Sequence, residues 1–367
     1  MSTFKGKIDE IPGISVDCFL PNNYDSKAFF LSHFHSDHIR GLYEDGADFI
    51  IKRNLPLYTS ALTKEIIKRK NPVLAEQVKE MDIKHPNSVT VGGIILSVTL
   101  IPAGHCPGSV MFLFETKASR ILYTGDYRIG VSDVRKFRSF YDSLGNVKKI
   151  DKIYLDTTFF LDSYPMFPTR SESMSVISKL ITEWTSRDEN NVIVLQLSAN
   201  YGYECLFKDI YAMCKMKIYI DEQNLELYSL IPQLDGCFAI DRHDARIFCK
   251  NVPFPIAQRH IRFIKPSAFR WTNSEKKATS LKNDNEGETY YVCYSTHASY
   301  EEGLAFINCL KPQQIHVCVE RENPVENLHI KQLIHQALSA ATRTNEAKRI
   351  KLFNVKSQNS IYPISKS

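Results

Sequence analysis

The stretch 31–38 constrains this chain more than any other part of its sequence. It places three histidines and one aspartate close together, directly after the apolar run 28–31: His33, His35, Asp37 and His38. The apolar run predicts a buried strand, so the polar side chains lie on the loop where that strand ends. In such a loop His33 and His35 point to one side while Asp37 and His38 reach another, so the loop can supply two neighbouring metal ions. Imidazole with carboxylate suits zinc best, then manganese or iron. The alternative is a polar loop with surface histidines.

Further polar side chains follow predicted strands at the point where each strand ends. Each comes directly after an apolar run or a tight Gly/Pro-rich loop: His105, Asp126, Asp156 and His297. Another carboxylate, Asp17, interrupts the apolar rhythm of the predicted strand 14–19. Rigid strands that aim residues on short loops at one edge of a sheet sandwich build a metal site in this way. For any one aspartate taken alone, a turn or a helix cap is an equally good explanation.

The pattern changes near residue 159. Predicted helices and strands alternate from there, with helices at 172–185 and up to Cys214 and strands at 192–195 and 218–220. This alternation predicts a small α/β unit with a parallel sheet. Strand character returns at 290–294. From residue 340 the sequence is polar and basic, and 347–352 is either a short nuclear-import signal or a solvated charged tail.

Composition sets the broad class of the protein. The chain has 367 residues, of which 43% are hydrophobic and 24% charged, and its formal net charge is +5. This balance predicts a soluble globular protein, and the mild positive charge permits a polyanionic partner without requiring one. The sequence shows neither a signal-peptide core nor an apolar run long enough for a membrane, so we expect no membrane association. Nine cysteines without a Cys-x-x-Cys pair indicate reduced thiols in a cytosolic or nuclear protein.

The motifs, taken in order, resemble those of the metallo-β-lactamase superfamily of hydrolases. The longer strings resemble one branch of it, the β-CASP DNA nucleases: Pro102–Ser109, Tyr123–Arg128, Tyr154–Thr158 and Ser295–Tyr300. Within that branch, the N-terminal Met1–Gly6 and the phrase Cys106–Phe114 are similar to the end-joining endonuclease. The resemblance implies an α/β fold, an αββα sandwich formed by residues 1–158 and 289–340. It further implies a β-CASP domain inserted at 159–288 and a basic, disordered tail at 341–367.

The resemblance also implies roles for individual residues. A tightly bound zinc ion would be held by His33, His35, His105 and Asp126. A second, more labile ion, Zn²⁺, Mg²⁺ or Mn²⁺, would be held by Asp37, His38 and the shared Asp126. Asp17 would orient a ligating histidine, and Asp156 and His297 would support the second metal or the leaving group. A phosphate-facing wall would be formed by Lys265, Ser267, Asn200 and Tyr201. The insertion of some relatives carries a further zinc site, which we do not expect here because the chain has Tyr219, Ile247 and Cys249 in that region.

The expected function is that of a nuclear, metal-dependent, structure-selective DNA endonuclease. It would hydrolyse phosphodiester bonds at hairpins, overhangs and broken ends during double-strand break repair by non-homologous end joining. The alternative within the branch is a 5′-to-3′ exonuclease of interstrand crosslink repair, followed by an RNA-processing endonuclease. Two functions from other classes fit the sequence less well. The inserted domain argues against a thioester or lactam hydrolase. A non-enzymatic scaffold protein with an inactive site would lack some of the metal ligands, and none is missing here. DNA is the implied partner. The DNA-dependent protein kinase and the end-joining ligase are weaker expectations, because the sequence stops soon after the catalytic region.

Overall fold

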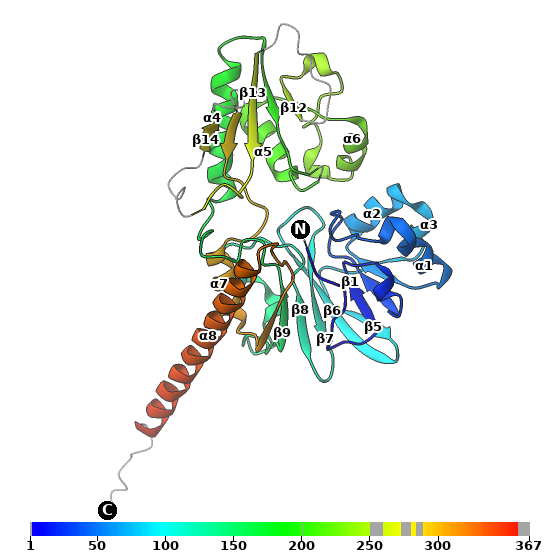
Figure 1. Cartoon of the computed structure of the whole chain (residues 1–367), viewed down its shortest axis with the longest axis vertical. Helices are drawn as coiled ribbons and strands as arrows, with labels where there is room; N and C mark the ends of the chain where they lie inside the picture. The colour runs from blue at the N-terminus through cyan, green and yellow to red at the C-terminus, as the bar shows by residue number, and fades with distance from the viewer. Residues whose placement is uncertain (1, 200, 250–259, 273–279, 284–288, 359–367) are drawn as a thin grey trace, which may run out of the picture.

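The computed structural model describes residues 2–199, 201–249, 260–272, 280–283 and 289–358. Two bodies are visible in Figure 1. The lower body contains the N-terminal strands and helices together with the C-terminal ones, and the upper body is built from the middle of the chain. This arrangement agrees with the expected α/β fold, in which a sandwich is interrupted by an inserted domain.

The lower body is a sandwich of two sheets. The first sheet is parallel and has the order β1-β2-β3-β4: Ile14–Val16, Ala28–Phe30, Leu57–Thr59 and Val78–Glu80. The second has the order β16-β9-β8-β7-β6-β5: Gln314–Val317, Lys152–Leu155, Arg120–Tyr123, Val110–Glu115, Ile94–Pro102 and Asn87–Val91. Aromatic side chains from both sheets, among them Phe30, Phe112 and Tyr123, fill the space between them. Burial of these rings is the main force that holds the two sheets together.

A helical layer covers the outer face of each sheet. The first sheet packs on the helices α1, α2 and α3: Ala47–Lys52, Ala61–Lys70 and Pro72–Ala75. The second sheet packs on α7 and α8, Tyr300–Leu310 and Pro324–Gln358, through a core that includes Leu122, Phe306 and Ile330. The layers therefore follow one another as helix, sheet, sheet and helix, which is the expected αββα sandwich.

Local sequence signals set several of these boundaries. The Ser60 hydroxyl accepts the N–H of Thr63 and begins α2. Ser299 and Glu302 form a capping box that begins α7. Gly92 and Gly93 both have positive φ, so they form the tight turn of the hairpin between β5 and β6.

The upper body is a six-stranded sheet of order β11-β12-β10-β13-β15-β14: Ile218–Tyr219, Ile247–Cys249, Asn191–Leu195, His260–Pro266, Thr289–Val292 and Ser280–Asn283. Its strands are parallel except β14, which runs antiparallel to β15. Three helices connect the strands: α4, α5 and α6, at Arg170–Thr185, Glu204–Cys214 and Glu222–Tyr228. Strand β15 corrects the expected domain boundary. We placed residue 289 at the start of the returning sandwich, but β15 pairs with β13 and so belongs to the inserted sheet through Val292.

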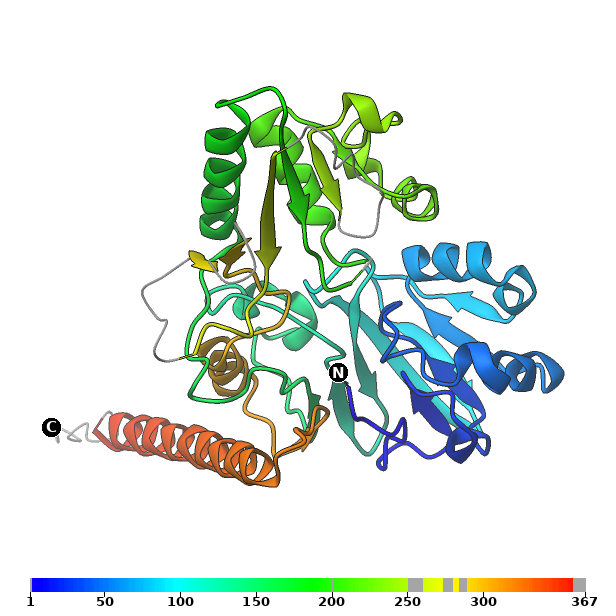
Figure 2. The same cartoon turned by 45° about the horizontal axis from the view of Figure 1, so that its top comes forward.

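The C-terminal segment also differs from expectation. Residues 341–358, expected to be disordered, continue α8, which extends away from the rest of the molecule in Figures 1 and 2. Neither proline nor glycine occurs after Pro324 in this helix, so nothing in the backbone interrupts it. Among the helices of the described residues, none combines the length and the apolar character that a bilayer span requires.

Candidate metal centre

Asp17 organises the start of the histidine-rich loop. Its carboxylate accepts the Ser32 N–H at 2.7 Å, the Ser32 hydroxyl at 2.5 Å and the Tyr123 hydroxyl at 2.9 Å. It also lies 2.8 Å from His38 Nδ1. Asp17 has a φ of +53°, a conformation in which few non-glycine residues occur, and its bonds hold it there. The loop after β2 is therefore fixed at both ends by one buried carboxylate.

Three imidazoles of this site have their protons fixed by neighbouring groups. The His35 Nε2 lies 2.8 Å from the Tyr201 carbonyl oxygen, and His105 Nδ1 lies 3.0 Å from the Thr296 carbonyl oxygen. A carbonyl only accepts, so each of these ring nitrogens carries a hydrogen. His33 Nδ1 faces Ser32 Oγ at 2.9 Å, and that hydroxyl already donates to Asp17, so His33 Nδ1 must donate. Each neutral ring then has a bare lone pair on its other nitrogen.

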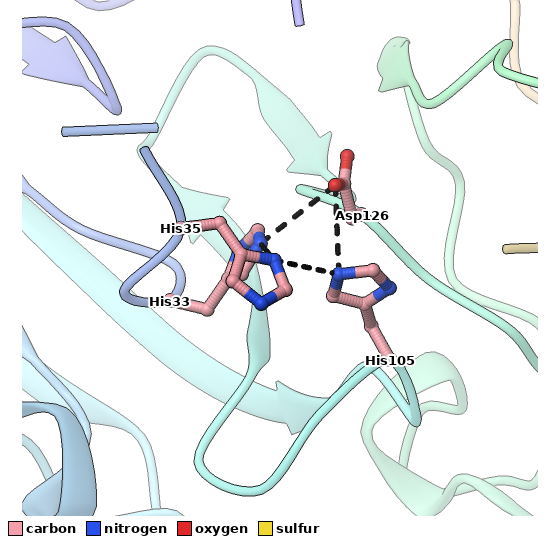
Figure 3. Close-up of side chains that lie close together, drawn as sticks. All are labelled: His33, His35, His105 and Asp126. Carbon is pink, nitrogen blue, oxygen red and sulfur yellow. Dashed lines mark hydrogen bonds and ion pairs between the residues drawn. The ribbon is translucent and has the colours of Figure 1, made fainter. Parts of the chain in front are cut away.

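These lone pairs converge on one point (Figure 3). His35 Nδ1 lies 3.0 Å from both His33 Nε2 and His105 Nε2. An oxygen of Asp126 lies 3.7 Å from His33 Nε2 and 3.6 Å from His105 Nε2. Three nitrogens without hydrogens and one carboxylate oxygen cannot satisfy one another by hydrogen bonding. Their donor set fits a tetrahedral divalent cation, as for zinc bound by imidazole and carboxylate.

A second group of acceptors lies on the other side of Asp126. When the His38 ring is neutral, its Nδ1 donates to Asp17 and its Nε2 is bare, and this buried atom has no hydrogen-bond partner among the described residues. It lies 3.2 Å from Asp126 Oδ1 and 3.8 Å from Asp37 Oδ2. The ligand atoms of Asp37, His38 and Asp126 all lie within 4.8 Å of one another. This set is richer in carboxylate than the first, and it fits a second cation that shares Asp126.

Burial sets the protonation of the first group. It lowers the pKa of His35, and lowers those of His33 and His105 to well below the usual histidine value, so these rings are neutral near pH 7. Burial also opposes charge on His38, but the Asp126 and Asp17 carboxylates outweigh it and raise its pKa well above 6.5. Neutral imidazole is the form that binds metals.

Asp156 and His297 form a separate pair beside Asp126. The His297 Nδ1 lies 2.9 Å from Asp156 Oδ2, and its Nε2 lies 4.0 Å from Asp126 Oδ2. Burial opposes a charge on His297, but Asp156 and Asp126 together raise its pKa above 6.5. Asp156 also accepts the Thr158 N–H and hydroxyl, which fixes its carboxylate. The structure thus brings all the expected metal-site and catalytic residues into one cluster.

The inserted domain contacts both metal-site loops of the sandwich. Besides the Tyr201 carbonyl on His35, the Tyr201 hydroxyl donates to the Pro107 carbonyl, and Arg170 donates to the Gly104 carbonyl. Gly202 has a φ of +115°, and a Cβ there would lie 3.5 Å from the His35 ring. Since a ligating histidine is oriented by the partner of its second nitrogen, the inserted domain helps to set the geometry of the site.

A cavity of about 790 Å³ opens over the site. His35, Asp37, His105, Asp126 and His297 lie in its floor and walls. Other residues that line it come from several elements: Phe34, Lys70, Thr158, Ser198, Tyr201, Tyr203, Asp221 and Phe269.

The expected phosphate-facing wall is only partly found there. Tyr201 lines the cavity, whereas Lys265 and Ser267, both described, do not. The Lys265 ammonium lies over the Tyr291 ring, 5.5 Å from its centroid, because β13 turns that side chain toward β15. Asn200 lies outside the described residues.

The residues that sequence reasoning missed are not typical metal ligands. Ser32 and Tyr123 hold Asp17, but a serine and a tyrosine next to predicted strands give no distinct signal. Lys70 ends a helix whose basic last turn suits the helix dipole. The sequence therefore provided no reason to place Lys70 in the cavity rather than in solvent.

Glu204, a buried carboxylate of the inserted domain, gives a testable effect on stability. This buried carboxylate at the start of α5 accepts the Gly202 N–H on both oxygens, at 2.8 and 3.0 Å. Burial raises its pKa from 4.5 to about 7, against the lowering effect of Gly202 and Arg170. The folded state therefore binds more protons than the unfolded state between these values, and stability is lost as the pH rises through them.

We expect Glu204→Gln to remove this pH dependence. Relative to the variant, the wild-type protein should lose about 2 kcal/mol of unfolding free energy from about pH 5 to about pH 7.5. Urea unfolding at several pH values measures the difference. Glu189→Gln, at an exposed position, is the control and should follow the wild type. Parallel curves for Glu204→Gln and wild type would show that Glu204 does not titrate in this range.

Comparisons with known proteins agree with this geometry. Residues 21–182 match the family model of the beta-lactamase superfamily domain, and residues 250–323 match that of the DNA repair metallo-beta-lactamase. Human Protein artemis is 31% identical over 342 residues, which are 85% of this chain and 48% of that protein. The zebrafish (Danio rerio) Protein artemis is 32% identical over 347 residues, 86% of this chain and 53% of that protein.

A second group of relatives is similar at lower coverage. The rat (Rattus norvegicus) 5' exonuclease Apollo is 30% identical over 307 residues, 82% of this chain and 52% of that protein. The chain thus spans about half the length of the curated relatives it matches. A crystal structure of a protein of unknown function from Enterococcus faecalis V583 superposes with a TM-score of 0.52 at 15% identity, covering 79% of this chain and 75% of that one. It shows the fold alone. The two family models and the relatives place this chain in the metallo-β-lactamase family, as an Artemis-like member of its DNA-repair β-CASP branch.

Proposed function

We propose that this protein is a metal-dependent DNA nuclease that hydrolyses phosphodiester bonds, and that it acts as a structure-selective endonuclease on hairpins, overhangs and broken ends in non-homologous end joining. The observation that carries the proposal is the presence of two neighbouring groups of possible metal ligands that share Asp126. The similarity to Protein artemis and the match to the DNA repair metallo-beta-lactamase model support DNA as the substrate. A nuclear location follows from that substrate.

The ligand roles are those expected from the sequence. His33, His35, His105 and Asp126 would hold one tightly bound zinc ion, and Asp37, His38 and Asp126 a second Zn²⁺, Mg²⁺ or Mn²⁺. Such a pair of ions would lower the pKa of water toward about 7 and neutralise charge on the phosphoryl oxygens. Asp17 contributes by fixing His38 and the loop through Ser32. The carbonyls of Tyr201 and Thr296 fix the tautomers of His35 and His105.

His297 is placed to handle a proton at the leaving group. Asp156 holds its Nδ1–H, so its Nε2 faces the cavity near Asp126. Protonated His297 would donate from Nε2 to the oxygen that leaves phosphorus, and Asp156 would stabilise the charge on the ring before that transfer. Lys70 lines the same cavity and supplies a positive charge for the DNA backbone.

The relatives named Apollo favour a second candidate, a 5′-to-3′ DNA exonuclease. An end-first exonuclease needs a pocket that captures a terminal 5′-phosphate, while an endonuclease needs a groove in which the strand continues on both sides of the scissile bond. Lys265 and Ser267, two residues of the expected phosphate-facing wall, do not line the cavity, which weakens the case for a pocket that captures a terminal 5′-phosphate.

One gel assay separates the two candidates. A sealed DNA hairpin without free ends and a 5′-phosphorylated single strand are incubated with the zinc-loaded protein and Mg²⁺ or Mn²⁺. We expect cleavage of the hairpin close to its tip. Degradation of the open strand alone, in steps from its 5′ end, would establish the exonuclease instead. The DNA-dependent protein kinase and an end-joining ligase remain proposed partners, to be tested by pull-down with purified proteins.

A further inference from the structure

Phe269 is an exposed aromatic side chain in the wall of the cavity over the metal centre. It follows β13 by three residues, lines the cavity together with His297 and Thr158, and is 57% exposed. Covering an exposed phenylalanine ring with another flat, apolar surface is energetically favourable, because both surfaces are removed from water. Most of the neighbouring lining residues, by contrast, are polar or charged.

The ring of Phe269 rests on a rigid support. Its centroid lies 4.8 Å from that of Phe159, which is buried at 2% exposure. Phe159 in turn packs against Phe167 at 5.0 Å in an edge-on contact, within the core cluster beneath the loop. The Tyr164 hydroxyl donates to the Phe269 carbonyl at 3.3 Å. One side of the loop is therefore anchored, while the ring keeps more than half of its surface free.

The position of Phe269 relative to the metal centre follows from a chain of short contacts. The Phe159 ring lies 6.1 Å from the His297 ring, and His297 Nε2 lies 4.0 Å from Asp126 Oδ2. Phe269 packs on Phe159, so its ring lies two ring contacts from His297 in the wall of the cavity.

We propose that Phe269 stacks on an unpaired nucleobase close to the scissile phosphate. This inference rests on the proposed nuclease function and names a base-binding subsite for it. Every base has a flat π face, so stacking accepts any sequence and requires only that the base be unpaired. A stacking site near the metals thus selects hairpin tips and overhangs over duplex.

The kinetic test uses Phe269→Ala and Phe269→Trp in the full chain. We expect Phe269→Ala to lose about 10-fold in kcat/KM on a single-strand overhang, and Phe269→Trp to retain the wild-type value, because an indole also stacks. Replacing the base nearest the cut by an abasic residue should cost the wild type about the same factor. The abasic substrate should cost Phe269→Ala nothing more, because the ring that the base would contact is already absent. Ile240→Ala, at a 93% exposed position outside the cavity lining, is the control and should behave as the wild type.

A spectroscopic readout reports stacking without turnover. An oligonucleotide with 2-aminopurine at the same position is titrated with each protein in Ca²⁺, which replaces the catalytic ion, and its fluorescence should fall with wild type and Phe269→Trp but not with Phe269→Ala. The stacking proposal would be overturned if Phe269→Ala quenched the fluorescence as strongly as the wild type. It would also be overturned if the abasic substrate lowered the kcat/KM of Phe269→Ala further. If the wild type cuts no DNA at all, the nuclease function fails instead, so the two failures are distinct.

Discussion

His35→Ala should remove bound zinc and hydrolytic activity together. His35 Nδ1 is the atom that approaches both His33 Nε2 and His105 Nε2 at 3.0 Å, so its loss takes a ligand from the centre of the first cluster. Removal of the hydrogen-bond partner that orients a ligating histidine already lowers the metal affinity by about 10- to 100-fold. Removal of the ligand itself should lower it by more than about 100-fold. Elemental analysis of the purified variant gives the zinc content, and the hairpin assay gives the activity.

The matched control for this variant is His85→Ala. His85 has a 74% exposed side chain that pairs with Asp82 at the surface, away from the metal centre. The control should keep its zinc and its activity. Full zinc retention in His35→Ala would exclude the assigned ligand set, whereas zinc loss with full activity would show that the first metal is structural.

The sequence predicted those parts of the fold that depend on local signals. Apolar runs that end in polar residues located β2, β8 and β9. The strand β15 was assigned to the wrong body because its residues are equally suited to either sheet. Only pairing with β13, which is distant in sequence, decides its place, and such non-local contacts leave no local pattern.

For the metal centre, the types of the residues were enough to predict the site, but the contacts around those residues could not be predicted. The repetition of histidine and aspartate at the ends of several predicted strands is conspicuous, so Asp17, Asp126 and His297 were predicted from it. The direction in which β13 turns Lys265, and the exposure of Phe269 on the following loop, depend on packing in three dimensions. The same holds for the Tyr201 and Thr296 carbonyls, because every residue has a carbonyl and only the fold decides which one meets a histidine.

The second cluster leads to the other large expected effect, on cleavage of a sealed hairpin by Asp37→Asn. Asp37 Oδ2 lies 3.8 Å from His38 Nε2 and accepts the Ser2 N–H at 2.7 Å. Asparagine has the same shape but lacks the negative charge that a hard divalent cation requires. A second ion at this site would contribute several kcal/mol of charge stabilisation to the transition state of the proposed reaction, so we expect hairpin opening to fall by about 100-fold or more.

DNA binding should survive in this variant, and that difference separates a catalytic role from a structural one. Lys70, which lines the cavity, is unchanged in Asp37→Asn and still attracts the phosphate backbone. Fluorescence anisotropy with a labelled hairpin should therefore give a Kd close to that of the wild type. Asp25→Asn, at a 76% exposed side chain that pairs with Lys7, is the control for both measurements. Wild-type cleavage by Asp37→Asn would exclude Asp37 as a ligand. Loss of binding and cleavage together would mean that Asp37 maintains the fold of the loop, through its bond to Ser2, rather than the second metal.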